Sequence, residues 1–246
     1  MSTVWITGGG SGIGKALALS FACDGWNVVI SGRNQQRLQG VCNLSSKIRF
    51  VICDITNENE VEQSQSKIGA IDLAVLNAGD YRPGPTHSCS TNEHRSIFEV
   101  NYFGTLNCIH AVLPAMKKQG GRLVVVGSLA GYIGLPNASA YGPSKAALIS
   151  LCESLRAELQ DSLVTLQLIN PGFVKSTLTD RNDFNMPNLI SAEQAAIEIR
   201  RGLQGDRFEI AFPGPFVRRM KLIQMIPYRL YFYVARKLRD GNDKRR

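Results

Sequence analysis

Two side chains that can exchange and stabilise a proton stand four residues apart in the sequence, Tyr141 and Lys145. Residues at this spacing share one face of a helix, so a phenol and an ammonium group are expected side by side. The ordinary pKa of tyrosine is about 10 and must fall by about 3 before the side chain acts as a base near neutral pH. A neighbouring cation stabilises the phenolate and lowers that pKa. Taken alone the pair is weak evidence, because the same spacing also describes an exposed tyrosine beside a solvated lysine.

Short apolar runs alternate along the chain with segments of helical periodicity. The predicted strands are Val4–Thr7, Val28–Ser31, Ile48–Cys53, Leu73–Asn77, Leu123–Val126, Val164–Ile169 and Phe208–Phe212. The predicted helices are Ile13–Cys23, Glu58–Lys67, Asn92–Lys118, Ala140–Gln160 and Ala192–Leu203. Several strand runs are continuously apolar, as strands covered on both faces require. The pattern predicts an α/β protein with a doubly wound parallel sheet of about seven strands and helices on both faces.

Glycine and asparagine follow four of the predicted strands. They occur at Gly8–Gly14, Asn77–Gly79, Gly127–Ser128 and Asn170–Gly172. In a parallel sheet of this kind, ligands bind beyond the carboxyl ends of the strands. The four segments therefore predict one shared site.

The glycine-rich run from Thr7 to Gly14 follows the first strand and opens a helix, which is the setting of a dinucleotide-binding loop. Its glycines permit a tight turn and a close approach to a pyrophosphate, and the helix N-terminus supplies unpaired N–H groups. The alternative is a flexible loop or a glycine-rich helix cap. The residues predicted to hold the cofactor here are Gly8, Gly10, Ser11, Gly12, Ile13 and Gly14.

The end of the second predicted strand, Ser31-Gly32-Arg33, carries no carboxylate to hold a ribose hydroxyl. An acid there would repel a 2′-phosphate, whereas the guanidinium of Arg33 can bind one through two hydrogen bonds. NADP(H) is therefore predicted in preference to NAD(H). The alternative is that Arg33 is a solvated surface residue, and Ser11 adds no second positive charge.

The ordered motifs Thr7-Gly-x-x-x-Gly-x-Gly14, Asn77-Ala-Gly79, Asn101, Ser128, Tyr141-x-x-x-Lys145 and Pro171-Gly172 resemble the short-chain dehydrogenase/reductase superfamily, small single-domain branch, over residues 2–212. The resemblance implies a Rossmann fold, a nicotinamide cofactor and reversible oxidation of an alcohol to a carbonyl. It also implies four catalytic roles. Tyr141 is the general acid/base, Lys145 binds the nicotinamide ribose and lowers the tyrosine pKa, and Ser128 hydrogen-bonds the substrate oxygen. Asn101 holds a water in a proton relay through Lys145.

The same resemblance assigns further cofactor contacts. Asp54 lies near the adenine ring, and the Asn77-Ala78-Gly79 segment lies beside the cofactor. The backbone of Val174 and the hydroxyl of Ser176 bind the nicotinamide carboxamide, with the neighbouring Thr177 as an alternative. The chain departs from the family pattern in lacking the usual glycine-rich C-terminal ending.

The segment after Pro171-Gly172 occupies the position of the family's substrate lid. Phe184, Met186 and Leu189 are expected to give it an apolar inner surface, which favours a lipophilic carbonyl or alcohol substrate. The alternative is that these three side chains pack the lid onto the core. The predicted function is an NADP(H)-dependent oxidoreductase, and the rival is a non-catalytic NADP(H)-binding sensor or scaffold of the same fold.

The net charge of +8 belongs entirely to the C-terminal segment. Residues 1–212 contain 18 Lys/Arg and 18 Asp/Glu, whereas residues 213–246 contain 10 and 2. We predict an oxidoreductase domain over 1–212 and a basic, aromatic extension over 213–246, with two helices broken at Pro227. Such helices fit an anionic membrane surface, a flap over the pocket or a subunit contact. Nucleic acid is not expected as a partner, because no nucleic-acid motif accompanies the charge.

Other features of the sequence exclude further classes of protein. The six cysteines have no CxxC spacing and are expected to be free thiols in a reducing compartment. His87, Cys89 and His94 lack zinc-ligand spacing, so no metal is predicted. A strand begins without a preceding signal sequence, and no apolar run is long enough to span a membrane, so a cytoplasmic protein is expected, with membrane association of the C-terminal segment left open. A homo-oligomer, dimer or tetramer, is expected through the helices around Asn101 and Tyr141.

Overall fold

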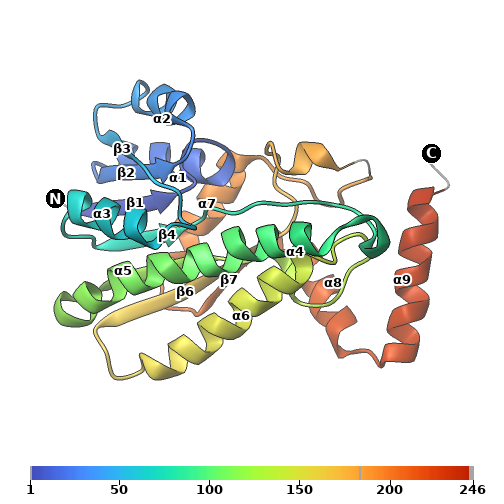
Figure 1. Cartoon of the computed structure of the whole chain (residues 1–246). Helices are drawn as coiled ribbons and strands as arrows, with labels where there is room; N and C mark the ends of the chain where they lie inside the picture. Colours follow the sequence, from blue (N-terminus) through green and yellow to red (C-terminus); the bar gives the residue numbers. More distant parts are fainter. Residues whose placement is uncertain (1, 183, 244–246) are drawn as a thin grey trace.

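In the computed structural model, which describes residues 2–182 and 184–243 and side chains up to residue 236, a seven-stranded parallel sheet forms the centre of the molecule (Figure 1). The strands are β1 (Thr3–Thr7), β2 (Asn27–Gly32), β3 (Ile48–Ile52), β4 (Leu73–Leu76), β5 (Gly121–Val126), β6 (Val164–Pro171) and β7 (Glu209–Phe212). Their order across the sheet is β3-β2-β1-β4-β5-β6-β7. The predicted doubly wound sheet is confirmed, and every predicted strand is present.

Helices connect the strands and cover the sheet. They are α1 (Gly12–Cys23), α2 (Gln35–Cys42), α3 (Glu58–Ile68), α4 (Thr91–Phe98), α5 (Gly104–Gln119), α6 (Tyr141–Glu158), α7 (Ala192–Gly202), α8 (Gly214–Met225) and α9 (Tyr228–Asp243). The long helix predicted over 92–118 is instead α4 and α5 joined by a π-helical segment, Glu99–Phe103. Helix α2 was not predicted.

The side chains of the central strands divide between two apolar cores. Val4 and Ile6 of β1 join the core that contains residues of α1, α2 and α7. Trp5, between them, joins the core on the opposite face, which contains residues of α3, α5 and α6. Because both faces are covered, successive residues of a strand are all apolar, which is the pattern that the sequence shows.

The chain reverses its direction of winding between β1 and β4, which are neighbours in the sheet. At such a switch point the loops that leave the two strands diverge, and a crevice opens at their carboxyl ends. The glycine-rich loop follows β1, and the Asn77–Gly79 segment follows β4. The topology therefore places these two motifs on either side of one crevice.

The C-terminal helices α8 and α9 leave the sheet after β7 and project from one end of the molecule (Figure 1). The break predicted at Pro227 is confirmed. Helix α8 is attached through Lys221, whose Nζ lies 2.5 Å from Oε2 of Glu209, and α9 through Tyr231, whose hydroxyl donates to the carbonyl of Gly134. The division of the chain into a domain and an extension at residue 212 stays a prediction.

All six cysteines are free, and Cys53, Cys108 and Cys152 are buried. Across the described residues we find no group of three His, Cys, Asp or Glu side chains that could hold a metal ion. Within the same residues, none of the helices has the length and hydropathy needed to cross a bilayer.

Candidate active site

The glycine-rich loop between β1 and α1 is shaped by close contacts that only glycine permits. Gly8 has a φ of +68°, a conformation that L side chains rarely adopt. A Cβ added to Gly14 would lie 2.5 Å from the carbonyl oxygen of Gly8. The amide of Asn77 holds this turn, since its Nδ2 donates to the carbonyl of Thr7 at 3.0 Å and to that of Gly8 at 3.3 Å. Asn77 therefore fixes the loop to the carboxyl end of β4.

The N-terminus of α1 has the features of an anion site. Ser11 is the N-cap residue, but its hydroxyl makes no capping hydrogen bond, and the first turn of this fully described helix contains no acidic residue. The N–H groups of the first turn thus have no side-chain acceptor of their own, and the helix dipole favours a negative charge there. Together with the close-packed glycine loop, this arrangement fits the pyrophosphate of a dinucleotide.

Two strand ends and one helix contribute charged residues at the β2–β3 side of the crevice. Arg33, after β2, lies 3.8 Å from the carboxylate of Asp54, after β3, and its side chain is 67% exposed. Arg37, on α2, lies against the loop, because a Cβ added to Gly10 would be 3.3 Å from the Cβ of Arg37. Arg37 was not predicted as a site residue, because α2 was not predicted. The signal that could have revealed the helix and Arg37 is Asn34, a typical N-cap residue, whose Oδ1 accepts a hydrogen bond from the N–H of Arg37 at 2.9 Å.

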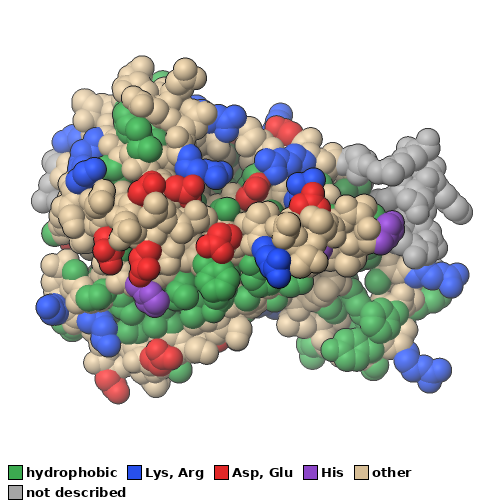
Figure 2. Space-filling model, in the orientation of Figure 1, with side chains coloured by type: hydrophobic (Ala, Val, Ile, Leu, Met, Phe, Trp, Pro, Cys, Tyr) green, Lys and Arg blue, Asp and Glu red, His purple; other side chains and the backbone are tan. Residues whose placement is uncertain are grey.

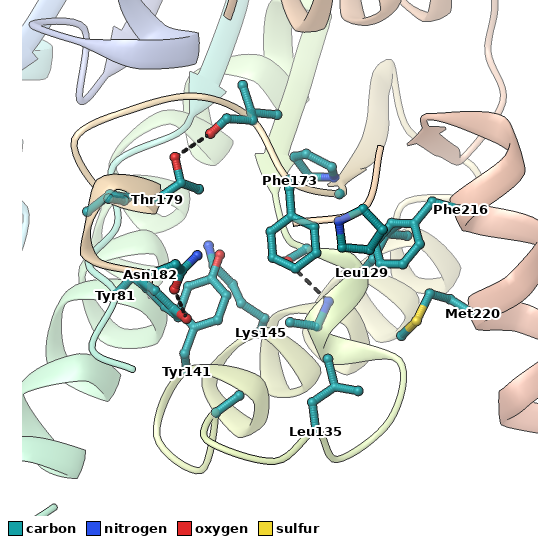
Figure 3. Close-up of a pocket in the computed structure, with 18 of the residues that line it drawn as sticks. Tyr81, Leu129, Leu135, Tyr141, Lys145, Phe173, Thr179, Asn182, Phe216 and Met220 are labelled. Carbon is teal, nitrogen blue, oxygen red and sulfur yellow. Dashed lines mark hydrogen bonds between the residues drawn. The ribbon is translucent and has the colours of Figure 1, made fainter. Parts of the chain in front are cut away.

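Ser128, Tyr141 and Lys145 line one cavity of about 670 Å³ at the carboxyl ends of the strands (Figure 3). Ser128 follows β5, and the other two residues occupy the first turns of α6. Nζ of Lys145 lies 5.8 Å from the centre of the Tyr141 ring and donates to the carbonyl of Val126 at 2.8 Å. The predicted pairing of a phenol and an ammonium group on one helix face is therefore present.

Burial dominates the ionisation of both side chains. Lys145 is 3% exposed, and burial lowers its pKa to about 8. Burial raises the pKa of Tyr141, while a hydrogen bond with Ser128 lowers it. The expectation that Lys145 lowers the tyrosine pKa stays a prediction, and burial, which disfavours the phenolate, is the largest influence on the pKa of Tyr141 in this structure. Tyr141 favours its neutral form, which is a proton donor.

Asn101 is buried behind the cavity, in the π-helical segment between α4 and α5. Its Oδ1 accepts from the N–H of Asp80 at 2.7 Å, and its Nδ2 donates to the carbonyl of Asp80 and the hydroxyl of Ser144, both at 3.0 Å. These bonds tie the loop after β4 to α6 and give Asn101 a positioning role. The water-mediated relay through Lys145 stays a prediction.

The lid segment after β6 is held at both of its ends. Thr179 Oγ1 donates to the carbonyl of Val174 at 2.9 Å and accepts from the N–H of Ser176 at 2.9 Å. Asn182 Oδ1 accepts from the hydroxyl of Tyr81 at 2.7 Å, and the Tyr81 ring meets that of Tyr141 edge-on at 4.9 Å (Figure 3). Neither Thr179 nor Tyr81 was identified from the sequence. The lid is thereby tied to the loop after β4.

The cavity joins the predicted cofactor crevice to an apolar compartment. The predicted residues that line it are Ile13, Asn77, Gly79, Ser128, Tyr141, Lys145, Val174 and Ser176. The remaining predicted residues lie around it, in the glycine loop (Gly8, Gly10, Ser11, Gly12, Gly14), beside that loop (Ala78), at the strand ends (Arg33, Asp54) or behind it (Asn101). The neighbouring Thr177 is not among the lining residues.

The apolar compartment is formed by the lid and by the C-terminal helices. Of the three lid residues expected to line it, Phe184 does so, whereas Leu189 is exposed and Met186 does not reach the cavity. The other apolar walls include Leu135, Phe173, Phe216, Met220, Ile223, Tyr231 and Val234. Five of these come from α8 and α9, so the C-terminal segment covers the pocket, which is one of the alternatives that the sequence left open.

Comparisons with known proteins agree with this geometry. The short chain dehydrogenase family model matches residues 2–186. An uncharacterized oxidoreductase from Myxococcus xanthus is 33% identical over 246 residues, covering 96% of this chain and 97% of the relative.

Two solved structures extend the comparison. A short chain dehydrogenase from Burkholderia cenocepacia in complex with NADP has a TM-score of 0.85 at 27% identity, covering 95% of this chain and 97% of that one. A short chain dehydrogenase/reductase from Burkholderia phymatum in complex with NAD has a TM-score of 0.83 at 23% identity, covering 90% and 92%, and shows the common fold. The fold, the site and these matches agree: the chain belongs to the short-chain dehydrogenase/reductase family of NAD(P)-dependent oxidoreductases.

Proposed function

We propose that this enzyme interconverts a lipophilic carbonyl compound and its alcohol with NADP(H), and that Tyr141 donates the proton in the reducing direction. The observation that carries the proposal is the position of Tyr141, which lines a cavity shared by the cofactor crevice and the apolar compartment. Burial keeps its phenol neutral, so the side chain holds a proton for the substrate oxygen. The bound nicotinamide supplies the hydride that the carbonyl carbon accepts.

The other residues of the site orient the substrate oxygen, stabilise Tyr141 after proton transfer and position the helix that carries it. Ser128 is close enough to Tyr141 to share a hydrogen bond, so one carbonyl oxygen can accept from both hydroxyls. Lys145, with its ammonium group beside the Tyr141 ring, stabilises the phenolate left after proton transfer. Asn101 keeps α6 in register with the loop after β4. The predicted roles of Tyr141 and Ser128 are retained in this proposal, whereas the ribose contact of Lys145 and the water relay of Asn101 stay predictions.

A lipophilic substrate is supported by the walls of the compartment. Phe173 and Phe216 stack with ring centres 5.7 Å apart, and Phe173 and Phe184 form a T-shaped pair with ring centres 5.8 Å apart. Among the described lining residues, the charged side chains are Lys145 and Arg219. Burial of a polar substrate body against these rings would leave its hydrogen-bonding groups unpaired, which disfavours it.

The preference for NADP(H) is supported by two guanidinium groups. Arg33 follows β2 where an NAD-specific site would carry an acid, and Arg37 lies beside the glycine loop. For Arg37, no side-chain hydrogen bond or ion pair is found with the described residues. These positions support the proposal that both cations bind a 2′-phosphate.

We also propose a homo-oligomer formed through α5 and α6. Figure 2 shows hydrophobic side chains gathered over these helices, and Phe103, which immediately precedes α5, is 47% exposed. The proposed partners are therefore a small-molecule substrate and a second copy of the chain. The proposed location of the protein is the cytoplasm.

The deciding experiment measures nicotinamide absorbance with NADPH and a panel of aliphatic and aromatic carbonyl compounds. Tyr141→Phe should lower kcat by about 10²- to 10⁴-fold while NADPH binding persists. The matched control is Tyr102→Phe, which removes a hydroxyl that makes no hydrogen bond within the described residues. If NADPH binds but no compound gives Tyr141-dependent turnover, the non-catalytic sensor or scaffold becomes the better description.

A further inference from the structure

The outer face of α8 and α9 exposes a group of large apolar and aromatic side chains. It consists of Leu222, Met225, Tyr228, Leu230, Phe232 and Tyr233, each at least 50% exposed. The rings of Tyr228 and Phe232 stack there with centres 5.9 Å apart. Figure 2 shows this hydrophobic patch over α8 and α9, with Lys and Arg side chains at its edge. A contiguous patch of this kind marks an interaction surface.

The opposite sides of the same two helices belong to the cavity. Met220 and Ile223 of α8, with Tyr231 and Val234 of α9, line its apolar compartment. Tyr231 is 6% exposed, and its hydroxyl is bonded to the carbonyl of Gly134, which fixes the orientation of α9. The outer face is therefore a defined surface of the folded protein, separated from the apolar compartment by the thickness of one helix layer.

The charge of the outer face selects its partner. The described cations on these helices that are exposed and do not line the cavity include Arg218 and Arg229, and the sequence contains no Asp or Glu between residues 213 and 236. A second copy related by two-fold symmetry would bring the same patch against itself and place cations opposite cations. An anionic lipid surface instead pairs with the cations and accepts the aromatic side chains at its headgroup level.

We infer that the outer face of α8 and α9 docks on an anionic membrane surface, where the apolar compartment exchanges its lipophilic substrate with the bilayer. The orientation follows from the structure, because docking through this face brings the helices that wall the compartment against the lipid. The inference rests on the proposed function only in assigning a lipophilic substrate to the compartment; the docking itself depends on the exposed face.

The test is co-sedimentation of the full-length protein with vesicles of phosphatidylcholine alone and of equal parts phosphatidylcholine and phosphatidylglycerol. Wild type should bind the mixed vesicles, with binding weakened by salt. Arg229→Glu should lower the partition coefficient by about tenfold or more, because each cation near the surface contributes to attraction. Phe232→Glu should abolish binding, and Phe232→Leu should preserve it, which separates insertion of the apolar face from charge attraction alone.

In the matched controls, an exposed apolar side chain and an arginine outside the outer face are each replaced by glutamate. Leu163→Glu alters a side chain that is 67% exposed and lies next to the amino end of β6, and Arg95→Glu reverses a charge on α4. Both should bind the mixed vesicles as wild type does. Equal binding of wild type and Phe232→Glu overturns the inference, and so does equally strong binding to phosphatidylcholine alone.

Sedimentation velocity and turnover complete the test. A change of oligomeric state in Phe232→Glu would identify the outer face as a contact between copies and overturn the inference. Reduction of a short, soluble carbonyl should be unchanged in the Phe232 and Arg229 variants, since neither residue lines the cavity. If wild type reduces no carbonyl at all, the proposed function fails, while the vesicle result still decides the docking.

Discussion

The ammonium nitrogen of Lys145 lies 2.8 Å from the carbonyl oxygen of Val126, the last residue of β5. Lys145 is almost fully buried, and this backbone group is a neutral acceptor. A buried cation with a neutral partner is less well stabilised than one paired with a carboxylate, so burial lowers the pKa of Lys145 to about 8. The strand that leads to Ser128 therefore also holds the lysine beside Tyr141.

Lys145 should make the stability of the ligand-free protein depend on pH. Its pKa falls from an ordinary 10.5 to about 8 on folding, so between these pH values the unfolded chain binds more protons. The free energy of unfolding should therefore rise from pH 8 to pH 10.5, by about 3 kcal/mol, and this contribution should be absent below pH 8. Urea unfolding of wild type and Lys145→Met across this pH range measures the contribution of Lys145. The other titrating groups are the same in both proteins, so their effects cancel when one free energy of unfolding is subtracted from the other. Parallel curves for the two proteins would contradict the prediction.

Arg33 and Arg37 should distinguish the two cofactors. Arg33→Ala is expected to weaken NADPH binding by about 10- to 100-fold, the effect of losing a hydrogen bond to a charged group, and to leave NADH binding nearly unchanged. Arg37→Ala should act in the same direction. Fluorescence titration of each variant with both cofactors measures this, with Arg95→Ala as the control. Equal losses for NADPH and NADH would show that neither guanidinium meets the 2′-phosphate.

The glycine loop should tolerate no side chain at Gly14. An added Cβ would lie 2.5 Å from the carbonyl oxygen of Gly8 and 2.7 Å from Nδ2 of Asn77, so Gly14→Ala should cost about 1–3 kcal/mol and weaken dinucleotide binding. The contrast is Gly40→Ala in α2, where nothing lies within 4 Å, and where alanine should stabilise the helix by up to about 1 kcal/mol. Thermal unfolding with and without NADPH tests both. A Gly14→Ala protein as stable as wild type would mean that the loop is not tightly packed.

Tyr81 should affect substrate binding rather than chemistry. Tyr81→Phe keeps the ring against Tyr141 but removes the 2.7 Å hydrogen bond to Asn182 that ties down the lid. The loss of about 1 kcal/mol should raise KM for a lipophilic carbonyl by about fivefold, with kcat little changed. Steady-state kinetics of Tyr81→Phe, with Tyr102→Phe as the control, test this prediction. A fall in kcat with constant KM would instead give Tyr81 a part in the proton transfer.

The strands and the cofactor loop were predictable because their signals are local. A strand buried on both faces is continuously apolar, as β4 is, and a glycine loop between a strand and a helix is visible as a string of residues. Helix α2 escaped because it is short and polar, with only Leu38 and Val41 buried. Its start was nevertheless marked by the capping residue Asn34, and recognition of that signal would also have revealed Arg37.

The parts of the site that escaped prediction depend on contacts between distant segments. Tyr81 and Asn182 are 101 residues apart in the chain, and no pattern links them. The rise in the pKa of Tyr141 caused by burial was not predictable either, because spacing reveals a neighbouring cation but not the extent of burial. The C-terminal helices showed their amphipathic character in the sequence, but not which side faces the cavity.

The walls of the cavity come from two parts of the chain, one inside and one outside the region that the family model matches. The residues proposed to move the proton lie inside the region matched by the family model, which ends at residue 186. Five of the residues that shape the apolar compartment lie beyond it, in α8 and α9. Mutations in these helices can therefore change which molecule fits without disturbing Tyr141 or the cofactor loop. Relatives that share Ser128, Tyr141 and Lys145 can thus act on different substrates. A substrate found for one relative therefore indicates the substrate of this chain only if that relative also has a similar pair of C-terminal helices.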